Sequence, residues 1–191
     1  MCSSDLQLGR LIEALFELAR LESGTVAIKI EPVSIAELLQ DVGMRFGLLA
    51  GAAQVKLNTL LDTSGVLVQA DVALIERVIS NLLENAIRHT PEHGEVRLEM
   101  IANEDLVRVR VCDTGCGIDP EQLPRIFDRF KRARTAADRE RAGLGLSIVK
   151  RIIDLHAQQV RVSSEKSLGT TVEFTLARVA PRSISALAAA G

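Results

Sequence analysis

The sequence predicts an α/β protein of the α+β kind, a two-layer sandwich in which a mixed β-sheet carries helices on one face. Three observations support this class. Residues 71–90 repeat apolar side chains at the three-and-four spacing of a buried helix, and Asp71 is placed to cap its start. Residues 95–101 and 106–112 alternate apolar and polar side chains as strands do, with a turn at 103–105. The other strands and helices are interspersed along the chain without an internal repeat.

The first element is a helix at residues 6–23. Its apolar residues recur about every 3.5 positions and widen into a broad face, made of Leu8, Leu11, Ile12, Leu15, Phe16, Leu18 and Ala19. We expect so broad a face to need partner helices that this chain does not contain. Residues 1–5 fit no element, and we expect a truncation or a junction there. Met1 is not followed by the basic and apolar residues of a signal peptide.

A short strand and a second helix come next. Residues 26–31 alternate as a strand that Pro32 closes. Ser34 is placed to cap a helix over residues 35–49, and Glu37 gives the form of a capping box. The later elements follow from the same kinds of pattern. In order they are strands at 55–60 and 66–70 around a turn at 62–65, the helix at 71–90, the hairpin at 95–112, a helix from Gly143 and Gly145 to about His156, and a hairpin of strands at 160–163 and 171–176.

The composition excludes several classes of protein. Hydrophobic residues make up 47% of the 191 residues but aromatic residues only 3%, so the core must be aliphatic. The net charge of −2 argues against a general nucleic-acid binder. No apolar run approaches the ~20 residues of a membrane span. Three cysteines, an odd number, suit free thiols in a reducing compartment.

Three polar residues of the 71–90 helix share one side of it. Asn81, Asn85 and Arg88 lie at i, i+4 and i+7, about a quarter turn from the centre of the apolar stripe. We therefore expect them at the rim of the core. An amide oxygen can ligate a hard cation, and a guanidinium can hold phosphate oxygens. Taken alone, the pattern is more typical of a helix surface that faces water.

Two glycine-rich segments follow. The first, Asp113-Thr-Gly-Cys-Gly-Ile118, ends a predicted strand, and its glycines allow positive φ and a close backbone approach to a ligand. The second, Ala142-Gly-Leu-Gly-Leu-Ser147, opens a helix whose free N–H groups and dipole favour phosphate. No P-loop sequence is present. Between them, residues 125–141 are strongly basic, which fits either a mobile lid that attracts polyphosphate or a solvated loop.

Together with the segment Arg125-Ile-Phe-Asp-Arg-Phe-Lys-Arg132, these motifs resemble the N, G1, F and G2 boxes of the sensor histidine kinase catalytic domain, in order and in spacing. That domain belongs to the ATPase group of Hsp90, gyrase B and MutL. The resemblance covers about residues 6–178. One position departs from it, because Arg141 stands where the family usually begins the G2 box with glycine.

The resemblance implies ATP and Mg²⁺ as cofactors. Asn85 would ligate the metal, and Asp113 would accept a hydrogen bond from the exocyclic amine of adenine. Asn81, Arg88 and Arg132 would act in catalysis. The implied ATP-binding residues are Asn81, Asn85, Arg88, His89, Asp113, Gly115, Gly117, Ile118, Lys131, Arg132, Gly143, Leu144, Gly145, Leu146 and Thr170.

The resemblance also implies an organisation of the chain. Residues 6–23 would be the second helix of a dimerisation hairpin, 24–178 the catalytic ATP-binding domain and 179–191 a disordered tail. No histidine has the family's phosphoacceptor context, so the helix that carries it would lie outside this chain. The implied partners are a second copy, bound through the N-terminal helix, and the receiver domain of a response regulator, with no nucleic acid. The chain would lie on the cytoplasmic side of a parent protein that is held in the cell membrane by a part not present here.

The implied function is the transfer of the γ-phosphate of Mg·ATP to a histidine, as the catalytic part of a two-component sensor histidine kinase. Three alternatives stay open. A non-catalytic nucleotide-binding or dimerisation module would result if Arg141 blocked nucleotide. A hydrolytic ATPase of the same fold would carry a glutamate where Asn81 stands, and we expect Glu84 to be solvated. A serine-kinase anti-sigma factor would lack the helix at 6–23.

Overall fold

A five-stranded mixed sheet forms one layer of the computed structural model, which describes residues 9, 12–13, 15–16, 18–23, 27–61, 65–128 and 144–179. Its strands are β2 (Lys56–Leu60), β4 (Glu95–Ala102), β5 (Leu106–Asp113), β6 (Val160–Glu165) and β7 (Gly169–Ala177), in the order β2-β4-β5-β7-β6. β2 runs parallel to β4, and the other pairs are antiparallel. The predicted mixed sheet is confirmed.

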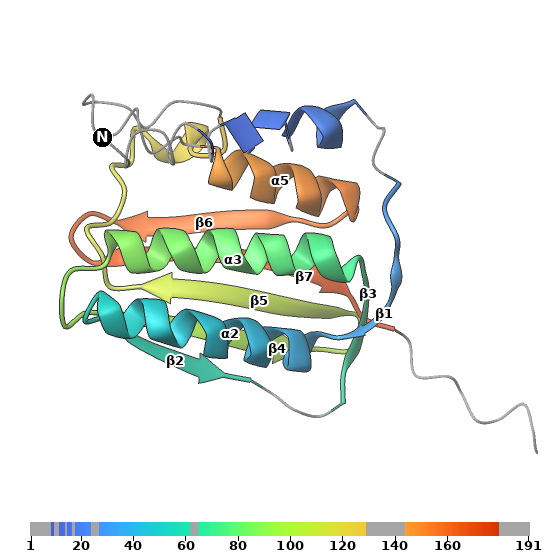
Figure 1. Ribbon diagram of the computed structural model, residues 1–191, viewed down its shortest axis with the longest axis horizontal. Coiled ribbons are helices and arrows are strands. Elements are labelled where there is room, and N and C mark those ends of the chain that lie inside the picture. Colours follow the sequence, from blue (N-terminus) through green and yellow to red (C-terminus); the bar gives the residue numbers. More distant parts are fainter. Residues whose placement is uncertain are drawn as a thin grey trace, which may run out of the picture.

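Three helices cover one face of this sheet: α2 (Ile35–Ala52), α3 (Val72–His89) and α5 (Gly145–Leu155) (Figure 1). α3 is the helix predicted at 71–90, and the side chain of Asp71 accepts a hydrogen bond from the N–H of Leu74, as a cap does. Its predicted stripe is buried from Ile75 to Ile87. A 3₁₀ turn, η1 (Leu123–Arg125), follows β5. No helix in the described part of the chain has the length and apolarity to cross a membrane.

The opposite face of the sheet is polar. Glu99, Arg110, Glu173 and Arg161 are paired in register across β4, β5, β7 and β6, so charges of opposite sign alternate. Nε of Arg110 lies 2.6 Å from Oε2 of Glu173, and this bond raises the pKa of Arg110. One face of the sheet is buried against the helices and the other faces solvent, which explains why apolar and polar residues alternate strictly along the strands.

Two local predictions were wrong. The first strand is β1 (Glu31–Ser34), which begins where the predicted strand was to end. Among the described strands it pairs only with β3 (Leu67–Ala70), in a separate two-stranded sheet. Pro32 is tolerated in it because a strand paired on one side can spare an N–H group. Ser34 does precede α2, but its side chain makes no capping hydrogen bond.

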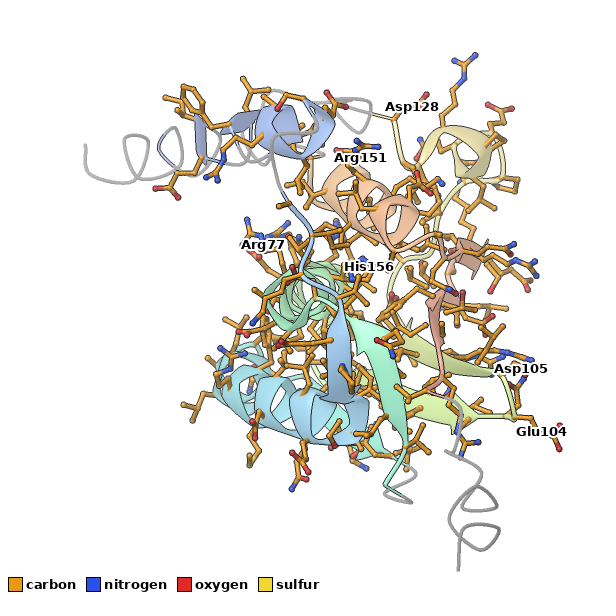
Figure 2. All side chains as sticks on the ribbon, turned by 90° about the vertical axis from the view of Figure 1, so that its right-hand side faces the viewer. Arg77, Glu104, Asp105, Asp128, Arg151 and His156 are labelled. Atoms are coloured by element: carbon orange, nitrogen blue, oxygen red, sulfur yellow. The ribbon has the colours of Figure 1, made fainter. Side chains whose placement is uncertain are left out.

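The N-terminal helix packs partly against its own chain. Leu18 and Leu21 are buried in the core, whereas Ile12, Leu15 and Phe16 are exposed. Arg151 of α5 is labelled in Figure 2. Its guanidinium donates two hydrogen bonds of 3.0 and 2.9 Å to the carbonyl oxygen of Leu21. The expectation that this face lacks a partner within the chain is therefore wrong at Leu18, whereas Leu21 was not among the residues of the predicted face. Only a tertiary contact could reveal this, because helix periodicity does not identify the partner.

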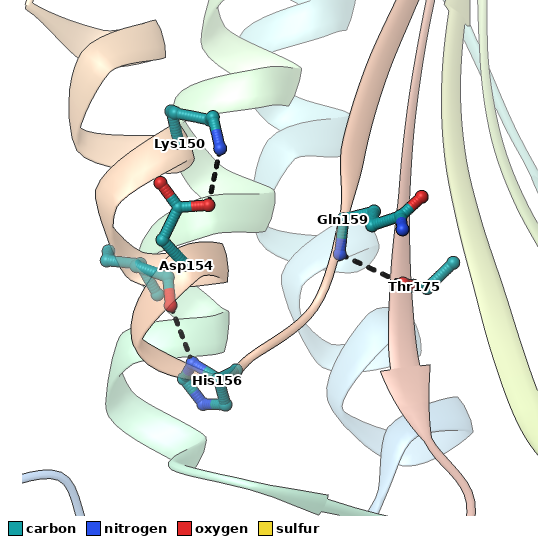
Figure 3. Close-up of polar contacts among 6 residues, drawn as sticks. Lys150, Asp154, His156, Gln159 and Thr175 are labelled. Carbon is teal, nitrogen blue, oxygen red and sulfur yellow. Dashed lines mark hydrogen bonds and ion pairs between the residues drawn. The ribbon is translucent and has the colours of Figure 1, made fainter.

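His156 joins the end of α5 to the start of α3. Its Nδ1 donates to the carbonyl oxygen of Ile152 at 2.8 Å (Figure 3), and its Nε2 accepts from the N–H of Asp71 at 3.0 Å. These two bonds require a neutral ring with its proton on Nδ1. His156 therefore has a structural role. Its two hydrogen bonds also fix the end of α5 relative to the start of α3.

Candidate functional site

Two amide side chains of α3 face the first turn of α5. Asn81 and Asn85 are both half-buried, which is the rim position that the helix geometry predicted. A methyl group placed on Gly145 would lie 3.6 Å from Oδ1 of Asn81 and 3.6 Å from Nδ2 of Asn85. The described side chains leave Nδ2 of Asn81 buried without a hydrogen-bond partner. A buried donor of this kind is costly unless water or a ligand satisfies it.

The first turn of α5 is anchored by apolar contacts. Leu144 and Leu146 are buried on either side of Gly145, and the hydroxyl of Ser147 donates to the carbonyl oxygen of Leu144 at 2.8 Å. The N-cap residue, Leu144, offers no side-chain cap to the N–H groups of this turn. The N–H groups of this turn, which receive no cap from Leu144, lie next to the two amides. Gly143, the other predicted glycine of this motif, lies outside the described residues.

Asp113 stands at the last position of β5. Its Oδ1 accepts hydrogen bonds from the N–H of Gly115 at 2.9 Å and from the N–H of Thr170 at 3.2 Å. Thr170 is also the partner of Asp113 in the β5–β7 register. Two residues that are far apart in the sequence, both predicted for the site, are thus adjacent. The two N–H groups hold the carboxylate in one orientation at the end of the sheet.

The loop after Asp113 needs its glycines for reasons internal to the protein. A side chain on Gly115 would overlap the backbone carbonyl of His89. Gly117 has φ of 67°, and a side chain there would overlap the backbone carbonyl of Glu165. The sequence predicted a close approach to a ligand, but at these two positions the close approach is to the chain's own backbone. Ile118, at the end of the loop, is buried.

Ser164, on β6, contacts two of the predicted site residues, although the sequence did not predict it. Its Oγ lies 2.8 Å from the N–H nitrogen of Ile118, 2.8 Å from the carbonyl oxygen of Gly169 and 2.9 Å from Oγ1 of Thr170. It therefore connects the loop to the β6–β7 hairpin, as does a bond of 2.8 Å from the N–H of Ser167 to the carbonyl oxygen of Cys116. Its local sequence carries no signal of this role, because only strand register brings it to the loop.

The basic residues predicted for the site are not gathered at one place in the described structure. Arg88 is exposed, so the prediction that it lies at the rim of the core is wrong, and its Nη2 lies 2.6 Å from Oε1 of Glu84. His89 is exposed as well. Arg88, His89, Gly115, Cys116 and their neighbours line a pocket of about 420 Å³ beside the loop. The predicted residues Lys131 and Arg132 lie outside the described residues, as does Arg141.

The two cysteines near the site differ in environment. Cys116 is exposed in the loop, whereas Cys112 is half-buried in β5. Burial raises the pKa of the Cys112 thiol. A smaller fraction of Cys112 is therefore thiolate at neutral pH, and it should be the less reactive of the two.

Comparison with known proteins gives consistent matches. The family model described as histidine kinase-, DNA gyrase B-, and HSP90-like ATPase matches residues 70–180. Drug sensory protein A of Synechocystis sp. is 34% identical over 182 residues, which cover 90% of this chain and 27% of that protein. Sensor histidine kinase MtrB of Mycolicibacterium paratuberculosis is 33% identical over 168 residues, which cover 87% of this chain and 30% of that protein. The chain thus spans less than a third of either relative.

Solved structures give the same result. Full-length ShkA in complex with AMPPNP superposes with a TM-score of 0.80 at 28% identity, covering 93% of this chain and 37% of ShkA. Histidine kinase ThkA, in complex with response regulator protein TrrA, superposes with a TM-score of 0.77 at 25% identity, covering 92% of this chain and 49% of ThkA. The range matched by the family model contains every site residue predicted above, from Asn81 to Thr170.

Proposed function

The chain belongs to the family of histidine kinase-, DNA gyrase B- and HSP90-like ATPases and carries an ATP-binding catalytic domain of the histidine kinase type, and on this basis we propose that it transfers the γ-phosphate of Mg·ATP to a histidine on a dimerisation helix outside this chain. One observation carries the proposal. Nδ2 of Asn81 is buried without a partner in the described structure, and the amide group of Asn81 lies beside the first turn of α5, to which the N-cap residue Leu144 gives no side-chain cap. Donors left in this state suit an anion, and the phosphates of ATP are the anion that the family binds.

Different residues of the site would bind the base, the metal ion and the phosphates. Asp113, with Oδ1 held by two backbone N–H groups, would accept from the exocyclic amine of adenine. Asn85 would hold Mg²⁺ through its amide oxygen, a neutral hard donor that suits this ion. Mg²⁺, when bound, would neutralise charge on the phosphates. Asn81 and the first turn of α5 would bind the phosphates, and Arg88, Lys131 and Arg132 would add positive charge. The catalytic contribution of these residues would be positioning and charge stabilisation.

The phosphoacceptor would come from another segment. Both ring nitrogens of His156 are engaged in hydrogen bonds inside the domain. His89 and His93, which are exposed, lack the phosphoacceptor context of the family. We propose that the N-terminal helix contributes to a homodimer, because Ile12, Leu15 and Phe16 stay exposed. In the intact kinase, which we place in the cell membrane with this part on the cytoplasmic side, the phosphoryl group would pass to a response regulator receiver domain. ThkA was solved with such a partner.

Hydrolysis of ATP is the weaker alternative. The position that would carry a water-activating glutamate is Asn81. Glu84 is exposed, and its carboxylate is paired with Arg88. A carboxylate that faces solvent and is held by a guanidinium is a poor candidate for activating a water.

The test combines binding with phosphotransfer. We expect the full chain to bind a fluorescent ATP analogue in the presence of Mg²⁺ and to label a separately made dimerisation hairpin that carries the histidine. Without the hairpin, no acid-labile label should appear on the chain. Absence of ATP binding would leave a non-catalytic module. Release of inorganic phosphate without labelling of the hairpin would indicate a hydrolase.

A further inference from the structure

We infer that Ser164 is a positioning residue for recognition of the nucleotide base, because it sets the place of Ile118 and Thr170 relative to Asp113. The inference rests on the proposed function and adds to it a residue that touches none of the reacting atoms. Three observations support it: the register of the sheet, the hydrogen-bonding capacity of the Ser164 hydroxyl, and the way in which the glycine-rich loop is attached to the rest of the chain.

The register places Ser164 in line with Asp113. Ser164 of β6 is paired with Thr170 of β7, and Thr170 is paired on its other side with Asp113 of β5. The three residues thus form a row across three adjacent strands. The row lies at the end of the sheet from which the glycine-rich loop departs. A change at Ser164 is therefore made next to this loop but two strands away from Asp113, the carboxylate proposed to recognise the base.

The hydroxyl of Ser164 has its full complement of hydrogen bonds. A serine hydroxyl has one proton to donate and two lone pairs to accept with. The carbonyl oxygen of Gly169, at 2.8 Å, can only accept, so the proton of Ser164 goes there. The N–H of Ile118, at 2.8 Å, can only donate. The remaining partner, Oγ1 of Thr170 at 2.9 Å, must then donate its own proton to Ser164. The rotation of the Thr170 hydroxyl is therefore fixed by Ser164.

Among the described residues, the loop has few other attachments at this end. Its first part is held by the bond from Gly115 to Asp113 and by a bond of 3.3 Å from the N–H of Cys116 to the carbonyl oxygen of His89. Its middle is held by the bond of 2.8 Å from the N–H of Ser167 to the carbonyl oxygen of Cys116. Its last residue, Ile118, is held by Ser164 and by burial of its side chain. Removing the hydroxyl would leave the N–H of Ile118 without its partner and would free the hydroxyl of Thr170 to turn. Both groups lie where the base is proposed to bind.

The experiment compares ATP with ITP, whose base lacks the exocyclic amine. In the full chain with Mg²⁺, we expect Ser164→Ala to weaken ATP about tenfold, the upper range for loss of a hydrogen bond that fixes a polar group. ITP should weaken by much less, so the ratio of the two affinities should fall at least about threefold. Ser164→Thr, which keeps a hydroxyl, should restore the ratio. Ser163→Ala, a neighbour whose side chain points to the other face of β6, should leave it at the wild-type value.

A purely structural role would give a different result. Affinities for ATP and ITP that fall in the same proportion, together with a lower melting temperature, would overturn the inference. Ser164→Cys provides a second test if Ser164→Ala does not fold, since a thiol is similar in shape and a weaker hydrogen-bond partner. An unchanged ratio in the folded Cys variant would also overturn the inference. Failure of the wild-type chain to bind ATP would refute the proposed function itself, which distinguishes the two failures.

Discussion

The two ends of the proposed nucleotide site are built in opposite ways. At the base end, Asp113, Ser164 and the glycine-rich loop are joined by hydrogen bonds within the chain, and the glycines fit closely against its own backbone. At the phosphate end, Asn81 has a buried donor without a partner in the described structure, and the N-cap residue of α5, Leu144, gives no side-chain cap. The polar groups at the base end have hydrogen-bond partners within the chain before any ligand binds. The phosphate end has a polar group without a partner among the described residues, which a ligand could bind.

This difference follows from what each end would bind. A base is recognised by a few hydrogen bonds whose geometry must be fixed in advance, so the protein gains from rigidity there. Phosphates and their metal carry strong charge, which can offset the cost of donors left unsatisfied in the free protein. Substitutions that break the internal contacts of the base end should therefore lower stability as well as affinity. Those at the phosphate end should affect binding or transfer with little change in stability.

The largest effect is expected from Asn85→Ala. Alanine is the better helix former, so the melting temperature should be unchanged or slightly higher. The loss of the proposed metal ligand should lower the rate of transfer to an added dimerisation hairpin by about a hundredfold at saturating ATP, because the metal stabilises charge in the transition state. Ser80→Ala, on the same helix, is the control. A folded Asn85→Ala variant that transfers phosphate like the wild type would remove Asn85 from the site.

Asp113→Asn tests the base end. It replaces the carboxylate with an amide that still offers one oxygen to the N–H groups of Gly115 and Thr170. We expect the fold to persist and ATP affinity to fall by about 1.5–3 kcal/mol, the contribution of a hydrogen bond to a charged group. Calorimetric titration would measure this. Asp119→Asn is the control, since that carboxylate pairs with Lys166 at the surface. Equal affinity in wild type and Asp113→Asn would make Asp113 only a turn residue.

Two glycine substitutions contrast the ends directly. Gly117→Ala puts a side chain against the carbonyl of Glu165 at a φ of 67°, and should lower the free energy of unfolding by at least about 2 kcal/mol. Gly145→Ala has the two amides, both at 3.6 Å, as its nearest neighbours among the described residues, and it should leave stability nearly unchanged while weakening the binding of ATP. Urea unfolding and ATP titration on both variants would measure this. Similar losses of stability in the two variants would contradict the contrast between the ends.

The smallest effect concerns the thiols. Cys116 is exposed in the loop beside the proposed base site, so Mg·ADP should slow its alkylation severalfold. Cys112 should react slowly with or without nucleotide, because it is half-buried and burial raises the pKa of its thiol. Mass spectrometry can count both adducts in one sample, so Cys112 acts as an internal control. Equal rates at Cys116 in both conditions would place the loop away from the nucleotide.

The sequence alone determined those features that depend on local periodicity. The stripe of α3, its cap at Asp71, the β4–β5 and β6–β7 hairpins and the mixed sheet were all predicted, because side-chain periods of 3.6 and 2 residues report directly which face is buried. The spacing of Asn81 and Asn85 also placed both at the rim of the core. The order of the four motifs along the chain was sufficient to indicate the family.

Tertiary structure decided everything that depends on which segments meet. β2 and β3, which flank a predicted turn, belong to different sheets, and the last turns of the N-terminal helix bury Leu18 and Leu21 within this chain. The steric need for Gly115 and Gly117 comes from His89 and Glu165, which the sequence does not place nearby. Ser164 meets Ile118 only through strand register. A pattern along the chain records the exposure of each residue, but the identity of its neighbour is fixed by packing at long range.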